Sequence, residues 1–315
     1  RIPDCEKSHK FRIVEEYLKK IMDIERLHRR MGLGILQPAD FSNLDLAYQN
    51  IINLMENPNI FSSQTEISKL LPTKEDISKF KNFMVEYTEL FNIEEIGKYH
   101  LNNISGSFFN EGQIPEIDKC ESKIKKYRNR LDLLADKLSY YIEKNSKFIK
   151  VEYTEKDGFY LQTTKKRGEI LKKSFQNLGN TNFYIGKDGE KLTLKAKDFE
   201  LKFLKDRTKI NSEVVNEISY KLRNLHNTLQ QKTTEVYLEK LEYFHNTYRD
   251  ILEKISIMVA KLDFFKSNAK TAIMFGYTEP IIVSHKNSFV NIKNMRHPII
   301  ERINPSSEYV PNDVT

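Results

Sequence analysis

Two short runs of basic residues in this sequence have the side chains that bind phosphate. Three cations are consecutive from Lys165, and three more alternate along the chain from Lys205. Ammonium, guanidinium and hydroxyl groups hold the sugar-phosphate backbone of a nucleic acid, a contact that positions the protein but reads no base sequence. The predicted phosphate-binding residues are one hydroxyl and six cations, namely Thr154, Lys165, Lys166, Arg167, Lys205, Arg207 and Lys209.

The distribution of charge supports this prediction. Residues 147–209 hold 16 Lys and Arg against 9 Asp and Glu, so the whole net charge of +7 lies in that segment of the 315-residue chain. Concentrated positive charge is the electrostatic signature of a protein that binds a polyanion. A solvated, lysine-rich surface is the other interpretation of the same pattern.

Motifs for catalysis or metal binding are missing from the sequence. It contains no G-x-x-x-x-G-K-[ST] phosphate loop and no G-x-S-x-G nucleophile motif. The seven histidines have no metal-ligand spacing, and His28, His226 and His245 are interpreted as packed or surface residues within helices. We therefore expect no catalytic or metal-binding residue in the chain itself.

The elements that must position the basic residues are two long helices. Apolar residues recur at alternating steps of 3 and 4 over residues 117–141 and again over residues 218–265, with a slip near Val236. Neither stretch contains Gly or Pro, while Pro115 suits a helix start. We expect these helices to pack against each other as an antiparallel pair.

A small β-rich module is predicted between the two helices. Strand-forming residues flank the pairs Asp157-Gly158 and Asp188-Gly189, and an Asp-Gly pair favours a tight hairpin turn. The module coincides with the surplus of positive charge.

The remaining residues complete a mainly α-helical fold. Shorter amphipathic helices are expected near the start, with Asp40 and Thr73 as helix N-caps, and a strand-rich segment is expected at the end. The predicted divisions are a helical core at 1–116, an ascending helix at 117–146, the β-rich module at 147–210, a descending helix at 211–271 and the last segment at 272–315.

The cellular compartment is constrained only weakly. Cys5 and Cys120 cannot form a disulfide framework, and no apolar run approaches the roughly 20 residues of a membrane span. We expect an intracellular, reducing environment, and a nucleoid, an organelle and a viral factory fit equally well.

Four stretches, in this order, resemble the middle of MutS-family DNA mismatch-repair proteins. Residues 21–41, IMDIERLHRRMGLGILQPADF, are similar to the family's Asp-φ-Glu-Arg-Leu helix and the entry to its next helix. Residues 150–164, KVEYTEKDGFYLQTT, are similar to its clamp hairpin, and residues 203–214 to the return from clamp to lever. VNIKNMRHPIIE and EYVPNDV are similar to the entry of its ATPase domain.

This resemblance implies a specific architecture and function. The helix pair would be the lever, the β-rich module a clamp that grips mismatched double-stranded DNA through its phosphates, and the last segment the first strands of an α/β ATPase domain. The family's adenine-stacking aromatic corresponds to Tyr309, with Val310 beside it. ATP, Mg²⁺ and a homodimer are implied for a longer parent protein whose phosphate loop follows Thr315. The chain alone is then expected not to hydrolyse ATP.

Two departures from the family pattern and one alternative accompany this interpretation. The segment 165–202 is longer than in common bacterial members, and Asn211-Ser212-Glu213 replaces the family's Thr/Ile-Pro-Glu turn. The alternative is a structural coiled-coil arm with a basic hinge, of the chromosome-organising type. It explains the helices and the basic module but does not explain RHPIIE (296–301) and YVPND (309–313) after the long helix.

Overall fold

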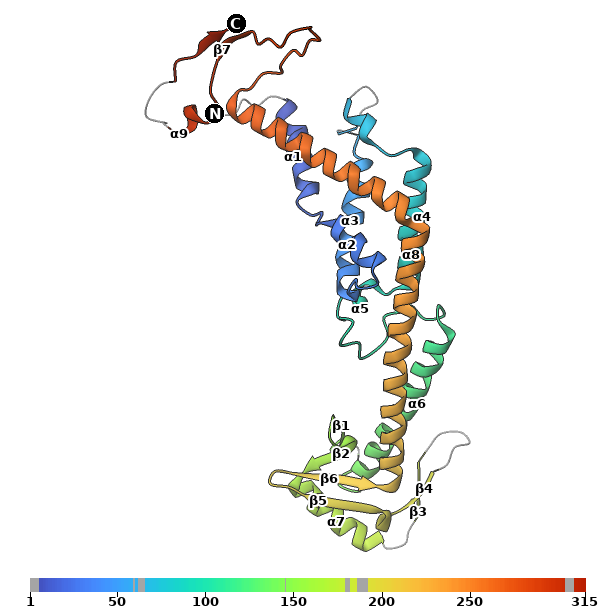
Figure 1. Cartoon of the computed structure of the whole chain (residues 1–315). Coiled ribbons are helices and arrows are strands. Elements are labelled where there is room, and N and C mark those ends of the chain that lie inside the picture. Colours follow the sequence, from blue (N-terminus) through green and yellow to red (C-terminus); the bar gives the residue numbers. More distant parts are fainter. Residues whose placement is uncertain are drawn as a thin grey trace. The chain divides into compact units, whose positions relative to one another are not determined.

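A computed structural model describes residues 6–58, 60–61, 66–144, 146–178, 182–185, 192–303 and 309–315. The chain divides into a larger unit within Pro3–Ser267 and a smaller one within Asn268–Thr315. The fold is mainly helical with a small antiparallel sheet, as the sequence predicted (Figure 1).

Short helices with an aromatic core make up the first part of the larger unit. They are α1 (Glu6–Leu18), α2 (Ile24–Gly32), α3 (Pro38–Met55), the 3₁₀ turn η1 (Glu66–Leu70), α4 (Lys74–Leu90) and α5 (Ile93–Ile96). Thr73 is the N-cap of α4, as predicted, because its side chain accepts from the Asp76 N–H at 3.1 Å. The prediction for Asp40 is wrong by one turn. Pro38 begins α3, and the Asp40 carboxylate accepts from the Gln37 N–H at 3.4 Å.

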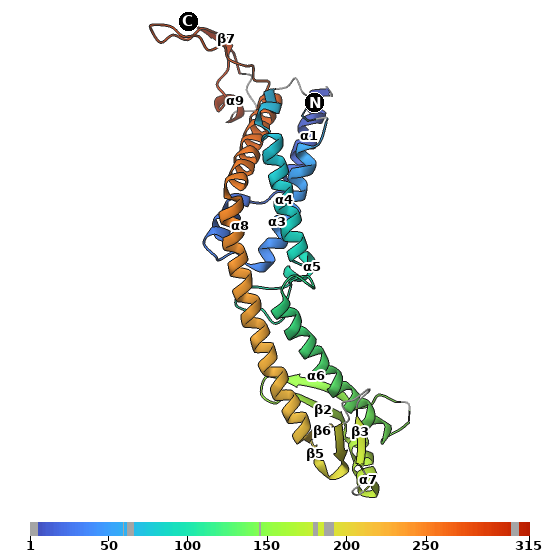
Figure 2. The same ribbon diagram turned by 90° about the vertical axis from the view of Figure 1, so that its right-hand side faces the viewer.

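Two long helices, α6 (Pro115–Tyr140) and α8 (Glu213–Phe275), lie side by side in both views (Figures 1 and 2). Their direction is antiparallel, because Lys232 of α8 pairs with Glu116 at 3.3 Å while Lys221, further back along α8, lies over the Tyr127 ring at 5.7 Å. The apolar seams predicted for this pair are largely buried. α6 ends six residues earlier than the predicted boundary at 146, in a turn after Tyr140.

The slip in the second seam is accommodated by a threonine. Leu229, Thr233 and Tyr237 succeed each other at steps of 4 and are all buried, so the seam passes through Thr233. Two successive steps of 4 locally shift the contact stripe around the helix without breaking it. Within the described part of the chain the Thr233 hydroxyl has no hydrogen-bond partner.

The β-rich module contains a four-stranded antiparallel sheet in the order β1-β2-β6-β5. The strands are β1 (Lys150–Thr154), β2 (Gly158–Thr164), β5 (Phe199–Phe203) and β6 (Arg207–Ser212), and a separate hairpin joins β3 (Asn182–Ile185) to β4 (Leu192–Lys195), which leads into the 3₁₀ turn η2 (Ala196–Asp198). Gly158 in the first hairpin has φ of +70°, a conformation that favours glycine, so the predicted turn is confirmed. The second turn, at Asp188-Gly189, lies outside the described residues.

A helix in this module was not predicted. α7 (Lys165–Leu178) follows β2 directly and covers one face of the sheet (Figure 1). Gly168 allows the close approach, because a Cβ at that position would lie 2.2 Å from the Thr208 hydroxyl on β6. The predicted β-rich module therefore contains a helix in addition to its strands.

Buried apolar residues of the larger unit form two separate clusters. The first unites α1 to α5 with the start of α6 and residues 229–262 of α8. The second unites the end of α6, the sheet, α7 and the start of α8. Among the described residues, none from 147–210 belongs to the first cluster and none from 1–115 to the second.

The smaller unit contains the end of α8, a two-stranded sheet of β7 (Ile292–Met295) and β8 (Asn312–Val314), and the one-turn helix α9 (Ile300–Ile303). Arg296 caps α8, since its Nη2 donates to the carbonyls of Phe275 and Gly276, each at 2.9 Å. The last segment contains fewer strands than expected, because residues 277–291 contain no strand.

Candidate nucleic-acid interface

The two faces of the four-stranded sheet differ in character. Side chains alternate between the faces of a strand, so strand register assigns each residue to a face. Phe159, Leu161 and Ile210 lie on one face, in the second apolar cluster with α7. The opposite, polar face carries most of the sheet's cations.

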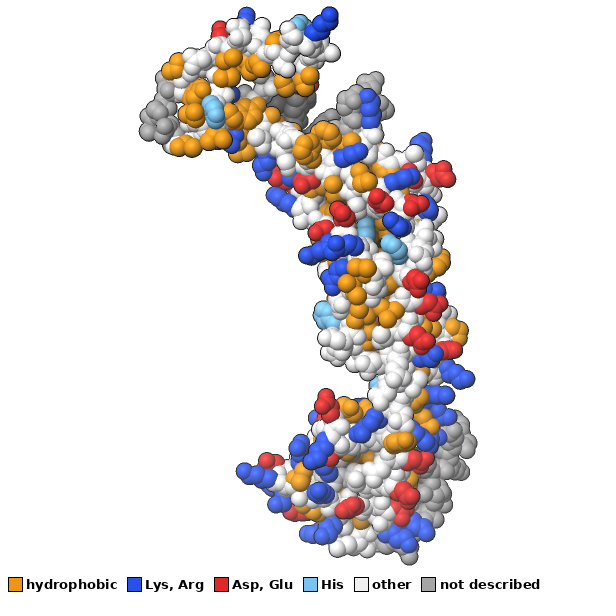
Figure 3. All heavy atoms as spheres, in the orientation of Figure 1, with side chains coloured by type: hydrophobic (Ala, Val, Ile, Leu, Met, Phe, Trp, Pro, Cys, Tyr) orange, Lys and Arg blue, Asp and Glu red, His pale blue; other side chains and the backbone are white. Residues whose placement is uncertain are grey.

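A row of long polar side chains crosses all four strands on the polar face. Lys150 pairs with Gln162, Gln162 with Lys209, and Lys209 with Lys202. Arg207 lies one pair further along, opposite Thr164. Lys150, Lys202 and Arg207 are exposed, and Figure 3 shows Lys and Arg side chains gathered around this module. Lys209 and Lys202 are on neighbouring strands, which are about 4.8 Å apart, and Lys150 lies two strands away from Lys209.

Five of the seven predicted phosphate-binding residues meet at one end of this sheet. The Lys165 N–H donates to the Asp206 carbonyl at 3.3 Å, which places the start of α7 beside the β5–β6 turn. The five residues are Lys165, Lys166, Arg167, Lys205 and Arg207. All are exposed except Arg167, whose guanidinium carbon lies 3.7 Å from the centroid of the Phe148 ring.

The first turn of α7 has an unusual charge distribution. It holds three cations and no acidic residue. The N-terminus of a helix carries partial positive charge and prefers anions, so cations there are unfavourable unless an anion binds nearby. This local cost favours a phosphate as the partner of Lys165 and Lys166.

The other two predicted residues lie near the β1–β2 turn and are engaged within the protein. The Thr154 hydroxyl accepts from the Asp157 N–H at 3.1 Å and lies 3.3 Å from its carboxylate. Lys209 pairs with the same carboxylate and lies 4.2 Å from the centroid of the Tyr160 ring. The hydrogen bond from Lys209 is the main reason why the pKa of Asp157 is lowered. Thr154 therefore acts as a turn cap in this structure.

Sequence reasoning missed Lys150 and Lys202. The sequence signal for Lys150 and Lys202 was the alternation of residues along β1 and β5. Together with the strand register, this alternation assigns both lysines to the polar face. It also missed α7, although Leu171, Phe175 and Leu178 recur at the helical steps of 4 and 3. Tyr309 and Val310 directly precede β8, and Val310 is 71% exposed. Their assignment to a nucleotide stays a prediction.

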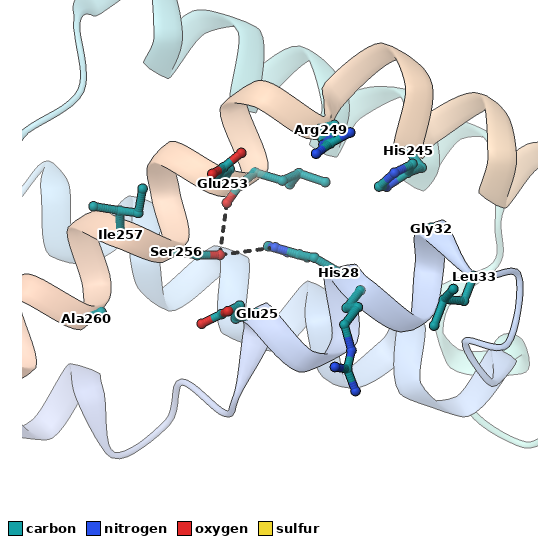
Figure 4. A pocket seen from close by; sticks show the side chains of 12 residues that line it. Glu25, His28, Gly32, Leu33, His245, Arg249, Glu253, Ser256, Ile257 and Ala260 are labelled. Atoms are coloured by element: carbon teal, nitrogen blue, oxygen red, sulfur yellow. Dashed lines mark hydrogen bonds between the residues drawn. The ribbon is translucent and has the colours of Figure 1, made fainter.

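A cavity of about 540 Å³ lies away from the sheet, between α2 and α8 (Figure 4). His245 and Arg249 line it from α8, while Glu25, His28 and Gly32 line it from α2. No cluster of three metal-ligating side chains occurs in the part of the chain that the structure describes. The cavity has cations and carboxylates on both helices, so its charge favours no particular ligand.

His28 is a structural histidine beside this cavity. Its Nε2 lies 2.7 Å from the Tyr48 hydroxyl and its Nδ1 3.1 Å from Ser256 Oγ. Ser256 also donates to the Leu252 carbonyl, so a neutral His28 with a proton on Nδ1 satisfies the whole chain of hydrogen bonds. Burial, with a smaller contribution from His245, lowers the pKa of His28 to about 4. The interpretation of His28 as a packed residue is confirmed.

Comparison of the sequence with known proteins finds relatives whose names all refer to DNA mismatch repair. No family model matches the chain. A putative DNA mismatch repair protein mutS homolog of Acanthamoeba polyphaga mimivirus is 28% identical over 96% of the chain. The DNA mismatch repair protein MutS of Thermosipho melanesiensis is 26% identical over 96%, and the mitochondrial DNA mismatch repair protein mutS homolog of Sarcophyton glaucum is 21% identical over 95%. The chain is therefore similar in sequence to MutS mismatch-repair proteins.

The similarity to MutS proteins extends over nearly the whole chain. The chain spans only 28% to 32% of the length of these relatives. None of the described helices is long and apolar enough to cross a membrane.

Proposed function

We propose that this MutS homologue is a DNA-binding part of a mismatch-repair protein that holds duplex DNA through its phosphates. The observation that carries the proposal is the basic polar face of the four-stranded sheet, together with the cationic start of α7. Phosphate contacts need exposed cations but no element fitted into a groove. The names of the relatives supply the biological setting, DNA mismatch repair.

The finer architecture belongs to the same proposal. Helices α1 to α5 act as the core, the α6–α8 pair as the lever and the β-rich module as the clamp. The smaller unit begins an ATPase domain in which Tyr309 and Val310 contact ATP, and Mg²⁺ and the phosphate loop belong to a longer parent protein that works as a dimer. DNA binding at the clamp is coupled to that domain through α8, which runs from the sheet into the smaller unit.

A structural coiled-coil arm is the second candidate, and the antiparallel α6–α8 pair is the observation that favours it. Such an arm needs no contact with DNA phosphates at its end. Duplex binding by the basic module therefore separates the two candidates.

The test is the salt dependence of binding to a labelled DNA duplex by the 315-residue chain. Each phosphate contact contributes about −0.9 to the slope of log K against log[salt]. Lys166→Ala with Arg207→Ala removes two exposed cations near one another at the sheet's end. We expect this double variant to weaken matched and mismatched duplexes equally and to flatten the slope by about 1.8.

The matched control is Lys119→Ala with Lys123→Ala, which removes the same charge from exposed positions of α6. We expect the control to bind as the unaltered chain does. Absence of duplex binding by the unaltered chain would refute the proposal. Equal salt slopes for the two double variants would show that the phosphate contacts are made elsewhere than at this end of the sheet.

A further inference from the structure

A second group of cations lies where the β1–β2 turn meets the two long helices. It consists of Lys125 and Arg128 on α6, Lys156 in the turn and Arg223 on α8, and we call it the junction patch. These residues come from three segments far apart in the sequence, so only the fold brings them together. None of them is among the phosphate-binding residues discussed above.

Phe159 at the start of β2 fixes the position of Arg128. The Arg128 guanidinium carbon lies 5.2 Å from the centroid of the Phe159 ring, and the His226 ring stacks on Phe159 with centroids 5.9 Å apart. The Phe159 N–H donates to Ser219 Oγ at 2.8 Å. The hairpin is therefore held against both α6 and α8 at this point.

Arg223 is held at the turn itself. Its Nη2 donates to the Glu155 carbonyl at 3.4 Å, and a Cβ at Gly158 would lie 3.0 Å from the same nitrogen. One long hydrogen bond leaves most of the five guanidinium N–H donors available. Lys125 is three residues before Arg128, so it lies on the same flank of α6.

In the junction patch, Lys156 interacts electrostatically with the neighbouring Asp157 carboxylate and is the smallest of the causes that lower the pKa of Asp157. Among the residues that the structure describes, no carboxylate forms an ion pair with any of the four cations. Three of the four are exposed, and Arg128 is half-buried. The positive field reaches His226, whose pKa is lowered by burial first and by Arg128 second. Unpaired like charges gathered in one place favour an anionic partner.

The junction patch begins at the β1–β2 turn, which borders the polar face of the sheet. Glu155 and Lys156 are in the same turn as Asp157, and Asp157 pairs with Lys209 in the middle of the polar face. The β1–β2 turn therefore lies between Lys209 on the polar face and Arg223 on α8, and contacts both.

We propose that the junction patch binds phosphates of the same DNA duplex that the sheet holds, so that the duplex touches the α6–α8 pair as well as the β-rich module. This inference rests on the proposed function. It adds a contact from the long helices themselves, which would let DNA act on α8 directly.

The test compares two double variants that remove equal charge from α6 and its surroundings. Lys125→Ala with Lys156→Ala deletes two exposed side chains of the junction patch while Arg128 and Arg223 keep the hairpin in place. Lys119→Ala with Lys123→Ala deletes two exposed side chains on the other flank of the α6 seam. Binding to a labelled matched duplex and to a labelled mismatched duplex is measured over a series of salt concentrations.

We expect the junction variant to weaken both duplexes and to lower the salt slope by about 2, roughly 1 for each phosphate that the variant can no longer bind, while the control changes neither. A junction variant that behaves as the control does would overturn the inference. If Lys166→Ala with Arg207→Ala still weakens binding in that case, the proposed function stands without it. If the unaltered chain binds neither duplex, the proposed function fails and the inference fails with it.

Discussion

Lys209, one of the predicted phosphate ligands, shows why a residue type alone does not define a binding group. Lys209 was predicted because it alternates with Lys205 and Arg207, but it pairs with Asp157 and lies against Tyr160. Releasing Lys209 to a phosphate would leave that carboxylate without its partner. Lys150 and Lys202, which flank the same row and are exposed, can bind a phosphate without this loss.

At the same scale, His28 makes folding stability depend on pH. Its pKa is lowered to about 4 in the folded chain, against about 6.5 when unfolded. Below pH 6.5 the unfolded chain takes up a proton that folded His28 does not, so the free energy of unfolding falls as the pH drops towards 4. The loss attributable to His28 reaches at most about 3 kcal/mol.

The measurement is the free energy of unfolding by urea at pH values between 4 and 7.5. His28→Gln should be less stable than the unaltered chain at pH 7.5, because it breaks the hydrogen bonds to Tyr48 and Ser256. It should also lose less stability on acidification. Parallel pH profiles for the two proteins would contradict the assignment of a neutral, half-buried His28.

Among the secondary-structure elements, long periodic stretches were predicted well and the short helix α7 was not. The α6 and α8 seams extend over many turns, so a few exposed members did not obscure the pattern. α7 has only three apolar residues along its buried face and contains Gly168, which disfavours a helix by about 1 kcal/mol relative to Ala. Its position is decided by packing on Thr208, a contact between distant parts of the chain that local patterns do not encode.

The cations in the first turn of α7 should lower the stability of the folded chain and strengthen its binding to DNA. Lys166→Glu places an acidic side chain in the first turn, where the helix dipole favours it, and removes a cation from the proposed phosphate-binding end of the sheet. We expect the free energy of unfolding to rise by about 0.5–1 kcal/mol while duplex binding weakens.

Urea unfolding and salt-dependent DNA binding check this prediction together. Lys173→Glu is the matched control, since it makes the same charge change at an exposed position away from the first turn. The control should weaken DNA binding less and should not stabilise the chain. A Lys166→Glu variant that loses both stability and DNA binding would show that the first turn does not favour an anion.

At the scale of the whole molecule, the surplus positive charge and the second cluster of buried apolar residues lie in the same part of the chain. The surplus positive charge at 147–209 could be read from composition, and it lies almost entirely within the second apolar cluster's module. The junction patch could not be read in this way, because its members lie in three segments that are far apart in the sequence. Only the pairing of α6 with α8, and of the hairpin with both, brings them together.

The two apolar clusters should respond separately to damage, because few described residues contact both. Ile210 of β6 and Leu44 of α3 are fully buried, one in each cluster. Replacing either with Ala removes buried apolar volume and costs about 2–5 kcal/mol locally.

We expect Ile210→Ala to speed amide hydrogen exchange in residues 150–212 while α3 and α4 stay protected. We expect Leu44→Ala to speed exchange in α3 and α4 while residues 150–212 stay protected. Exchange measured by mass spectrometry would contradict two separate clusters if both variants lost protection evenly along the larger unit. Separate responses would mean that DNA held at the sheet can order or loosen its own module without unfolding the helices of the first cluster, leaving α8 as the element that carries the change onward.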